Sequence, residues 1–206
     1  MSQRYDAVLF DLLTALLDSW TVWNRTAGSE AMGRKWRAEY LRLTYGCGAY
    51  RPYETLVAEA AETVGLGAAY ADKLDAAWSG LTAWSGVDAT LAELKKHHRL
   101  GVVTNCSQRL GLQAAARVSV PFEVIVTSER AGFYKPDPRP YQMALDELNL
   151  PASRVLFVAG SGFDLFGTAR VGLDTYWHNR VGLSAPPGAP APLKESPEIT
   201  GVLDLV

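Results

Sequence analysis

Four short segments of this chain carry side chains that could together cleave a bond at an electrophilic centre. Asp11 supplies a carboxylate, Thr104 and Asn105 supply small polar donors, Lys135 supplies a cation, and Asp164 supplies a second carboxylate. A carboxylate can act as a nucleophile, and a nearby cation keeps it ionised. Taken singly, each residue has an ordinary structural explanation as a helix cap, a turn residue or a solvated charge. Their order along the chain is what points to chemistry.

These residues follow apolar runs, or lie near them, and the runs predict strands. Ala7–Phe10 is a short apolar run that is typical of a buried strand in a parallel sheet. Further strands are expected at 100–104, 122–126, 155–159 and 174–177, and helices at 89–97, 107–117, 139–148 and 163–171. Alternating strands and helices predict a parallel sheet. The carboxyl ends of parallel strands meet at one edge, where such sheets bind ligands. We therefore expect the four segments to share one site.

The stretch from residue 16 to residue 87 shows only helical patterns, over 29–43, 52–65 and 68–78. A helical block inside an α/β pattern predicts an inserted cap. The expected division is a core of residues 1–15 and 88–206 and an all-helical cap of residues 16–87. The Pro/Ala-rich segment 184–192 predicts a mobile loop.

The composition indicates an ordinary globular protein. The chain has 206 residues, of which 48% are hydrophobic and 20% charged, and its formal net charge is −2. This charge favours neither nucleic acid nor an anionic membrane as a partner, and no apolar run approaches the roughly 18 residues of a membrane helix. Cys47 and Cys106 are far apart and match no metal-binding spacing, so we expect reduced thiols in a cytoplasmic protein.

In this order the four segments resemble the haloacid dehalogenase superfamily, most closely its 2-haloacid dehalogenase branch. Three features carry the closer resemblance: Trp36-Arg37 in the first long cap helix, the spacing from Lys135 to Tyr141, and the segment Tyr176–Arg180 near the end of the α/β pattern. The resemblance implies a Rossmann-like core with a helical cap. It also implies a hydrolase that cleaves the carbon–halogen bond of small 2-haloalkanoic acids, without a metal or cofactor.

The resemblance also implies roles for individual residues. Asp11 would attack the halogen-bearing carbon to form an ester, Lys135 would orient Asp11, and Asp164 would help activate water. The residues implied to contact the substrate or the halide are Arg37, Thr104, Asn105, Tyr141 and Ser161. The cap aromatics Trp20, Trp23, Trp36 and Tyr40 suit either an apolar wall of the site or packing within the cap.

Several positions depart from the patterns of the superfamily. Leu13 and Gly160 stand where phosphatases of the superfamily have acidic residues, which makes a Mg²⁺ site unfavourable. Thr14 and Ala15 stand where the dehalogenases have Gly and Thr, so the hydroxyl is shifted by one residue. Two alternatives stay open: a Mg²⁺-dependent phosphatase or related hydrolase, and a binding module that has lost its chemistry. The branch resemblance also suggests a homodimer.

Overall fold

The structure, a computed structural model, describes residues 4–206 and contains one parallel sheet with the strand order β3-β2-β1-β4-β5-β6. The strands are β1 (Ala7–Phe10), β2 (Arg99–Thr104), β3 (Val124–Thr127), β4 (Val155–Ala159), β5 (Asp174–His178) and β6 (Lys194–Ser196). The predicted α/β fold with a Rossmann-like parallel core is confirmed. The sequence does not predict β6, because Lys-Glu-Ser contains no apolar residue.

Strand β1 lies in the middle of the sheet, between β2 and β4. The chain builds the sheet outward from β1 to β2 and β3 on one side, and then to β4, β5 and β6 on the other. The strand order therefore reverses beside β1. In open α/β sheets, ligands bind at this reversal, outside the carboxyl ends of the strands. Asp11, the residue after β1, lies at that point.

Alternate residues of each strand face opposite sides of the sheet, as the pleat requires. Val8 and Phe10 belong to a hydrophobic cluster with α5 (Val87–Leu94) and α6 (Gln108–Ala115), on one face. The other face packs on α8 (Pro138–Leu148) and α9 (Asp164–Val171). Because both faces are covered, the strands read as continuous apolar runs rather than as alternating patterns. This explains why the sequence locates them well.

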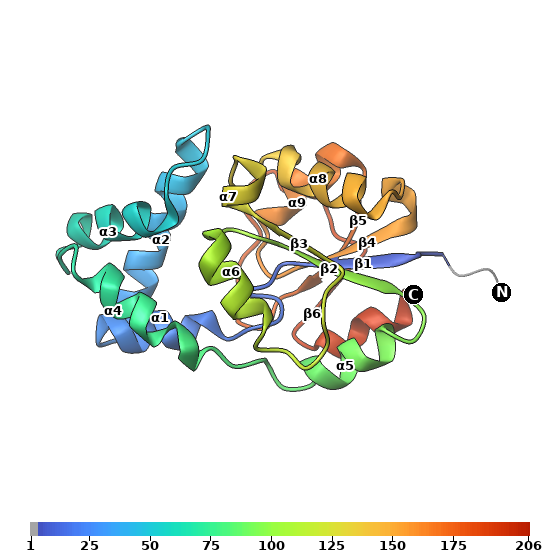
Figure 1. Cartoon of the computed structure of the whole chain (residues 1–206), viewed down its shortest axis with the longest axis horizontal. Coiled ribbons are helices and arrows are strands. Elements are labelled where there is room, and N and C mark those ends of the chain that lie inside the picture. The colour runs from blue at the N-terminus through green and yellow to red at the C-terminus, as the bar shows by residue number, and fades with distance from the viewer. Residues whose placement is uncertain (1–3) are drawn as a thin grey trace.

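Four helices between β1 and β2 stand together apart from the sheet, on the side to which the strands' carboxyl ends point (Figure 1). They are α1 (Ser19–Ala27), α2 (Glu30–Gly46), α3 (Tyr53–Thr63) and α4 (Tyr70–Ala77). The stretch that enters this helical segment and the stretch that leaves it lie side by side, joined by an isolated antiparallel bridge between Leu17 and Ala83. The sequence does not predict two short helices, α1 and α7 (Ser128–Ala131), because more than half of the residues in each are polar. We keep 16–87 as the proposed extent of the cap.

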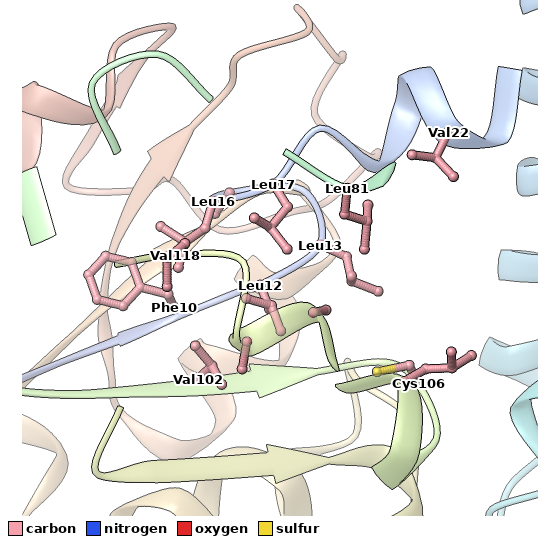
Figure 2. Close-up of a cluster of buried hydrophobic side chains, with 14 of the residues drawn as sticks. Phe10, Leu12, Leu13, Leu16, Leu17, Val22, Leu81, Val102, Cys106 and Val118 are labelled. Carbon is pink, nitrogen blue, oxygen red and sulfur yellow. The ribbon is translucent and has the colours of Figure 1, made fainter. Parts of the chain in front are cut away.

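One buried hydrophobic cluster joins the helical segment to the sheet. Figure 2 shows its part around the loop after β1, where Leu12, Leu13, Leu16 and Leu17 lie between Val102 of β2 and Val22 of α1. The apolar residues that follow Asp11 thus anchor the loop on which Asp11 stands. Burial of this cluster stabilises the position of α1–α4 over the carboxyl ends of the strands.

Candidate functional site

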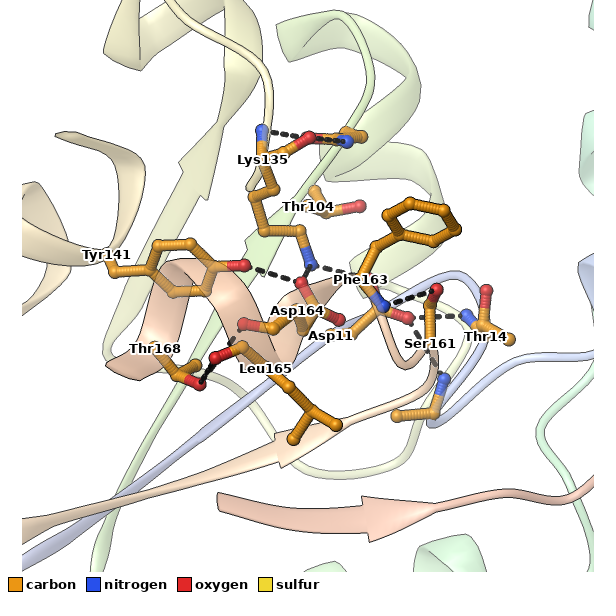
Figure 3. A network of polar contacts seen from close by, with 12 residues as sticks. Asp11, Thr14, Thr104, Lys135, Tyr141, Ser161, Phe163, Asp164, Leu165 and Thr168 are labelled. Carbon is orange, nitrogen blue, oxygen red and sulfur yellow. Dashed lines mark hydrogen bonds and ion pairs between the residues drawn. The ribbon is translucent and has the colours of Figure 1, made fainter. Parts of the chain in front are cut away.

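Three charged side chains meet at the carboxyl ends of β1 and β4 (Figure 3): Asp11 and Lys135 come from two loops, and Asp164 is the first residue of helix α9. The amine Nζ of Lys135 lies 2.9 Å from Oδ1 of Asp11 and 3.0 Å from Oδ1 of Asp164. All three residues are buried, with exposed fractions of 4–7%. Burial by itself would lower the pKa of Lys135, but the two carboxylates outweigh it and raise that pKa, so the amine stays charged.

The loop after β1 fixes the carboxylate of Asp11 through its own backbone. The amides of Thr14 and Ala15 donate to Oδ2 of Asp11 at 2.9 and 3.1 Å. The carbonyl groups of this loop are held as well: Trp84 Nε1 donates to the Thr14 carbonyl at 2.9 Å, and His178 Nδ1 lies 2.7 Å from the Ala15 carbonyl. The two oxygens of Asp11 therefore have different partners, amides on Oδ2 and the Lys135 amine on Oδ1.

Asn105 positions the loop that carries Lys135. Its side-chain amide donates to the Lys135 carbonyl at 2.9 Å, and its Oδ1 accepts from the Lys135 amide at 2.8 Å and from the Ser128 hydroxyl at 2.8 Å. Asn105 also lines the cavity described below. An asparagine amide has two N–H groups, and within residues 4–206 one of the two on Asn105 has a partner, the Lys135 carbonyl.

Asp164 begins α9 and is held from behind by Tyr141 of α8, whose hydroxyl donates to Asp164 Oδ1 at 2.6 Å. Gly167 makes room for this contact, since a Cβ there would lie 2.3 Å from the Tyr141 ring. Burial raises the pKa of Asp164, Lys135 opposes that shift, and Asp11 adds to it. A carboxyl group whose pKa is raised toward neutrality suits proton transfer to and from water.

A second buried cation, Arg37 of α2, reaches the same region from the cap. Its guanidinium donates to the hydroxyls of Ser19 at 2.8 Å and Thr14 at 2.9 Å, and it lies over the ring of Trp20, 4.1 Å from the centroid. Among residues 4–206 it forms no ion pair with a carboxylate. Burial lowers the pKa of Arg37, but a guanidinium remains charged in proteins. The site thus contains a desolvated positive charge that contacts no carboxylate directly within the described residues.

These groups line a cavity of about 220 Å³ between the cap and the core. Of the predicted site residues, Asp11, Arg37, Asn105, Lys135, Ser161 and Asp164 line it. Its apolar wall includes Trp20, Trp23 and Tyr40 of the cap, as one of the two interpretations of the aromatics expects. Trp36 instead packs inside the cap, where its Nε1 donates to the Val57 carbonyl at 2.9 Å.

Two residues that the sequence predicts to contact the substrate, Thr104 and Tyr141, do not line this cavity, and their contact with a substrate stays a prediction. Thr104 is buried at the end of β2, where its hydroxyl faces the thiol of Cys106, and it is not among the residues that line the cavity. Tyr141 is fully buried behind Asp164 and does not line the cavity either. In both cases the backbone turns the side chain into the core rather than toward the cap. Tyr141 contacts the charged groups of the site through its hydroxyl, which bonds to Asp164, and through its ring, whose centroid lies 6.0 Å from the Lys135 amine.

Other residues of the site escape prediction from the sequence. Ser19 holds Arg37, and Tyr45 of α2 lies on Phe163 with ring centroids 4.7 Å apart, so that the two rings bridge cap and core over the cavity. Leu183 also lines the cavity, as do Ser184 and Pro186 of the Pro/Ala-rich segment 184–192. For Phe163 the sequence offers one signal of a place in the site, because this residue directly precedes the predicted site residue Asp164. The other contacts depend on how the cap meets the core.

The residues present do not fit a Mg²⁺ site of the kind that the alternative reading requires. A Cβ at Gly160 would lie 2.7 Å from Asp11 Oδ2 and 2.3 Å from the Ala15 amide nitrogen, so no acidic side chain fits there. The amine of Lys135 contacts both remaining carboxylates. Within residues 4–206, no group of three or more acidic, histidine or cysteine side chains could hold a metal. Mg²⁺ needs near-octahedral oxygen ligands, which this set does not supply.

Comparison with known proteins agrees with the fold. Residues 8–178 match the family model of the haloacid dehalogenase-like hydrolases, and the chain belongs to that family. It is 29% identical over 206 residues to (S)-2-haloacid dehalogenase 4A of Burkholderia cepacia, with 91% of this chain and 88% of that protein covered.

Solved structures of dehalogenases share the fold. An L-2-haloacid dehalogenase crystal structure superposes with a TM-score of 0.88 at 24% identity, with 99% of both chains covered. A crystal structure described as a dehalogenase with an intermediate complex superposes with a TM-score of 0.85 at 26% identity, and 100% of this chain and 99% of that chain are covered. This chain is thus similar in fold, over its whole length, to dehalogenases.

Proposed function

We propose that this protein hydrolyses the carbon–halogen bond of small 2-haloalkanoic acids through an ester formed on Asp11. One observation carries the proposal: a buried aspartate is paired with Lys135 at 2.9 Å, and the same cavity holds a second buried cation, Arg37. The first cation keeps the nucleophile ionised. The second is suited to bind an anion that enters or leaves the cavity. The Burkholderia relative named above as an (S)-2-haloacid dehalogenase supports this substrate class.

In the first step, a carboxylate oxygen of Asp11 attacks C2 of the substrate from the side opposite the halogen. The new C–O bond forms as the C–X bond breaks, and the halide leaves with the electron pair. Chloride and bromide need no proton to leave, so no general acid is required. Arg37 and the side-chain amide of Asn105 line the cavity and would stabilise the leaving halide.

In the second step, water hydrolyses the ester at the carboxyl carbon of Asp11. If Oδ1 carries the ester bond, Oδ2 becomes the carbonyl oxygen and develops negative charge. The amides of Thr14 and Ala15, at 2.9 and 3.1 Å, would stabilise that oxyanion. Asp164, whose Oδ1 is held by Lys135 and Tyr141, would take the proton from water. The products are the 2-hydroxy acid, halide and one proton, and Asp11 is regenerated.

The proposal includes no metal. The poor fit of Gly160 to an acidic residue argues against Mg²⁺-dependent phosphoryl transfer, as does the contact of the Lys135 amine with both carboxylates. Two carboxylates and two cations make the charged groups of the site formally neutral. A monoanionic haloacid suits such a site better than a dianionic phosphate ester, which would face the carboxylate of Asp11 without a shielding ion.

The cavity indicates the size of the substrate. An apolar cavity of about 150 Å³ is large enough for benzene, and this one has about 220 Å³ with a partly aromatic wall. We therefore propose that the enzyme accepts 2-haloacids with side chains longer than a methyl group. Activity on 2-bromohexanoate that is at least as efficient as on 2-bromopropionate would support this; rejection of the longer acid would contradict it.

The deciding experiment measures halide release by the purified protein from chloroacetate, bromoacetate and both enantiomers of 2-chloropropionate. We expect turnover of the (S) enantiomer that EDTA does not reduce, and none by the Asp11→Asn variant. A single turnover in H₂¹⁸O should place the label in the Asp11 carboxylate before it reaches the product. Failure to release halide from any of these acids would refute the proposal, and Mg²⁺-dependent hydrolysis of p-nitrophenyl phosphate would favour the phosphatase instead.

The homodimer and the cytoplasmic location stay predictions. None of the helices in the described part of the chain is both long and apolar enough to cross a bilayer.

A further inference from the structure

Two hydroxyl groups, those of Thr14 and Ser19, hold the guanidinium of Arg37. Nη1 donates to Ser19 Oγ at 2.8 Å and Nη2 donates to Thr14 Oγ1 at 2.9 Å. In both bonds the hydroxyl oxygen accepts, so each hydroxyl keeps its own proton to donate elsewhere. Where that proton goes differs between the two residues.

The Ser19 hydroxyl donates to the carbonyl of Leu13 and is therefore satisfied. The Thr14 hydroxyl has no acceptor among residues 4–206, and Thr14 lines the cavity. Figure 3 shows the backbone nitrogen of Thr14 turned toward Asp11, while its hydroxyl lies outside the drawn network. One residue thus contacts the carboxylate of Asp11 through its amide and the cap cation through its side chain, with one O–H donor left over.

We propose that the Thr14 hydroxyl donates a hydrogen bond to the anion that Arg37 binds, and that Ser19 positions Arg37. The proposal rests on the proposed function, because the anion is the carboxylate or the halide of a 2-haloacid. Ala15 cannot donate from its side chain, so Thr14 supplies the hydroxyl at this loop. Because Thr14 points to Arg37 rather than to Asp11, it acts on the bound anion and not on the nucleophile.

The test compares Thr14→Val, which keeps the shape and removes the hydroxyl, with Thr14→Ser, which restores it. The exposed Thr63, whose hydroxyl bonds to the Glu59 carbonyl, offers Thr63→Val as a matched control far from the site. We expect Thr14→Val to raise KM for (S)-2-chloropropionate about 10- to 100-fold, the cost of a hydrogen bond to a charged group. Thr14→Ser should restore most of the loss, and Ser19→Ala should raise KM by less than Thr14→Val does.

Equilibrium binding of bromide and of lactate, followed by tryptophan fluorescence or calorimetry, separates the two anions and does not need turnover. Weaker binding of bromide alone to Thr14→Val would place the hydroxyl at the halide, and weaker binding of lactate alone would place it at the carboxylate. Wild-type affinities for both anions and a wild-type KM in a folded Thr14→Val would overturn the proposal. If Thr14→Val does not fold, Thr14→Ala provides the same comparison with Thr14→Ser.

The binding measurements also separate this inference from the proposed function. If wild-type protein binds the anions but releases no halide, the proposed function fails, and the comparison of Thr14→Val with Thr14→Ser still decides the role of Thr14. If wild-type protein releases halide and Thr14→Val behaves like wild type, only the inference about Thr14 fails.

Discussion

Replacing Lys135 by methionine removes the charge that holds the two carboxylates together while it keeps most of the side-chain volume. Nζ lies 2.9 Å from Asp11 and 3.0 Å from Asp164. At an effective dielectric constant of about 20, each contact corresponds to an attraction of about 6 kcal/mol. Desolvation offsets part of this, and removing one partner of a buried ion pair costs about 3–5 kcal/mol. If the transition state loses about 4 kcal/mol of stabilisation, kcat falls about a thousandfold.

Halide release from (S)-2-chloropropionate measures the effect, and circular dichroism shows whether the variant is folded. The matched control is Lys96→Met, which removes a surface lysine whose side chain is 60% exposed and pairs with the exposed Glu93; it should behave like wild type. A folded Lys135→Met that stays within tenfold of the wild-type kcat would refute the electrostatic reasoning, because Lys135 would then be only a loop residue.

The stability of the same variant should depend on pH in a defined direction. Burial and Asp11 raise the pKa of Asp164 above its ordinary value of 3.8, and Lys135 opposes this shift. Without Lys135 the pKa rises further, so the folded state binds a proton over a pH range in which the unfolded state does not. Stability then decreases as pH rises from about 4 through the raised pKa. The Tm of Lys135→Met should be nearest to wild type at pH 4–5 and furthest below it at pH 8; a constant difference would contradict this.

Three further predictions concern the surroundings of the site. Gly160→Asp should lower stability by about 1–3 kcal/mol and confer no Mg²⁺-dependent phosphatase activity, whereas Gly46→Ala, with no atom within 4 Å of the added Cβ, should not destabilise the protein in thermal unfolding. Burial raises the pKa of Cys106 to about 12, so iodoacetamide should leave this thiol unmodified and activity intact in the native protein; alkylation seen by mass spectrometry would contradict the burial. Tyr141→Phe removes the donor at 2.6 Å from Asp164 and should lower the free energy of unfolding by about 1–3 kcal/mol. The loss should be larger at pH 8 than at pH 5, because the carboxylate of Asp164 is harder to ionise without this donor. Equal losses of unfolding free energy at both pH values would exclude this role.

The sequence alone predicts most of the core. Ala7–Phe10 matches β1, and the run at 155–159 matches β4, because strands buried on both faces must be apolar throughout. The polar residues after these strands come together because parallel strands end at the same edge of the sheet. The approach of Lys135 to both Asp11 and Asp164 therefore follows from chain order and topology.

The tertiary structure alone decides which of the polar side chains reach the cavity. Local patterns place Thr104 and Asn105 at the same strand end, yet only Asn105 lines the cavity, because neighbouring residues point in different directions. Arg37 meets Thr14 only where the inserted cap docks on the loop after β1. That docking depends on burial of the hydrophobic cluster shared by cap and core, which no short stretch of sequence encodes. The sequence determines where the proposed nucleophile, Asp11, stands, and packing of the cap determines what surrounds the cavity beside it.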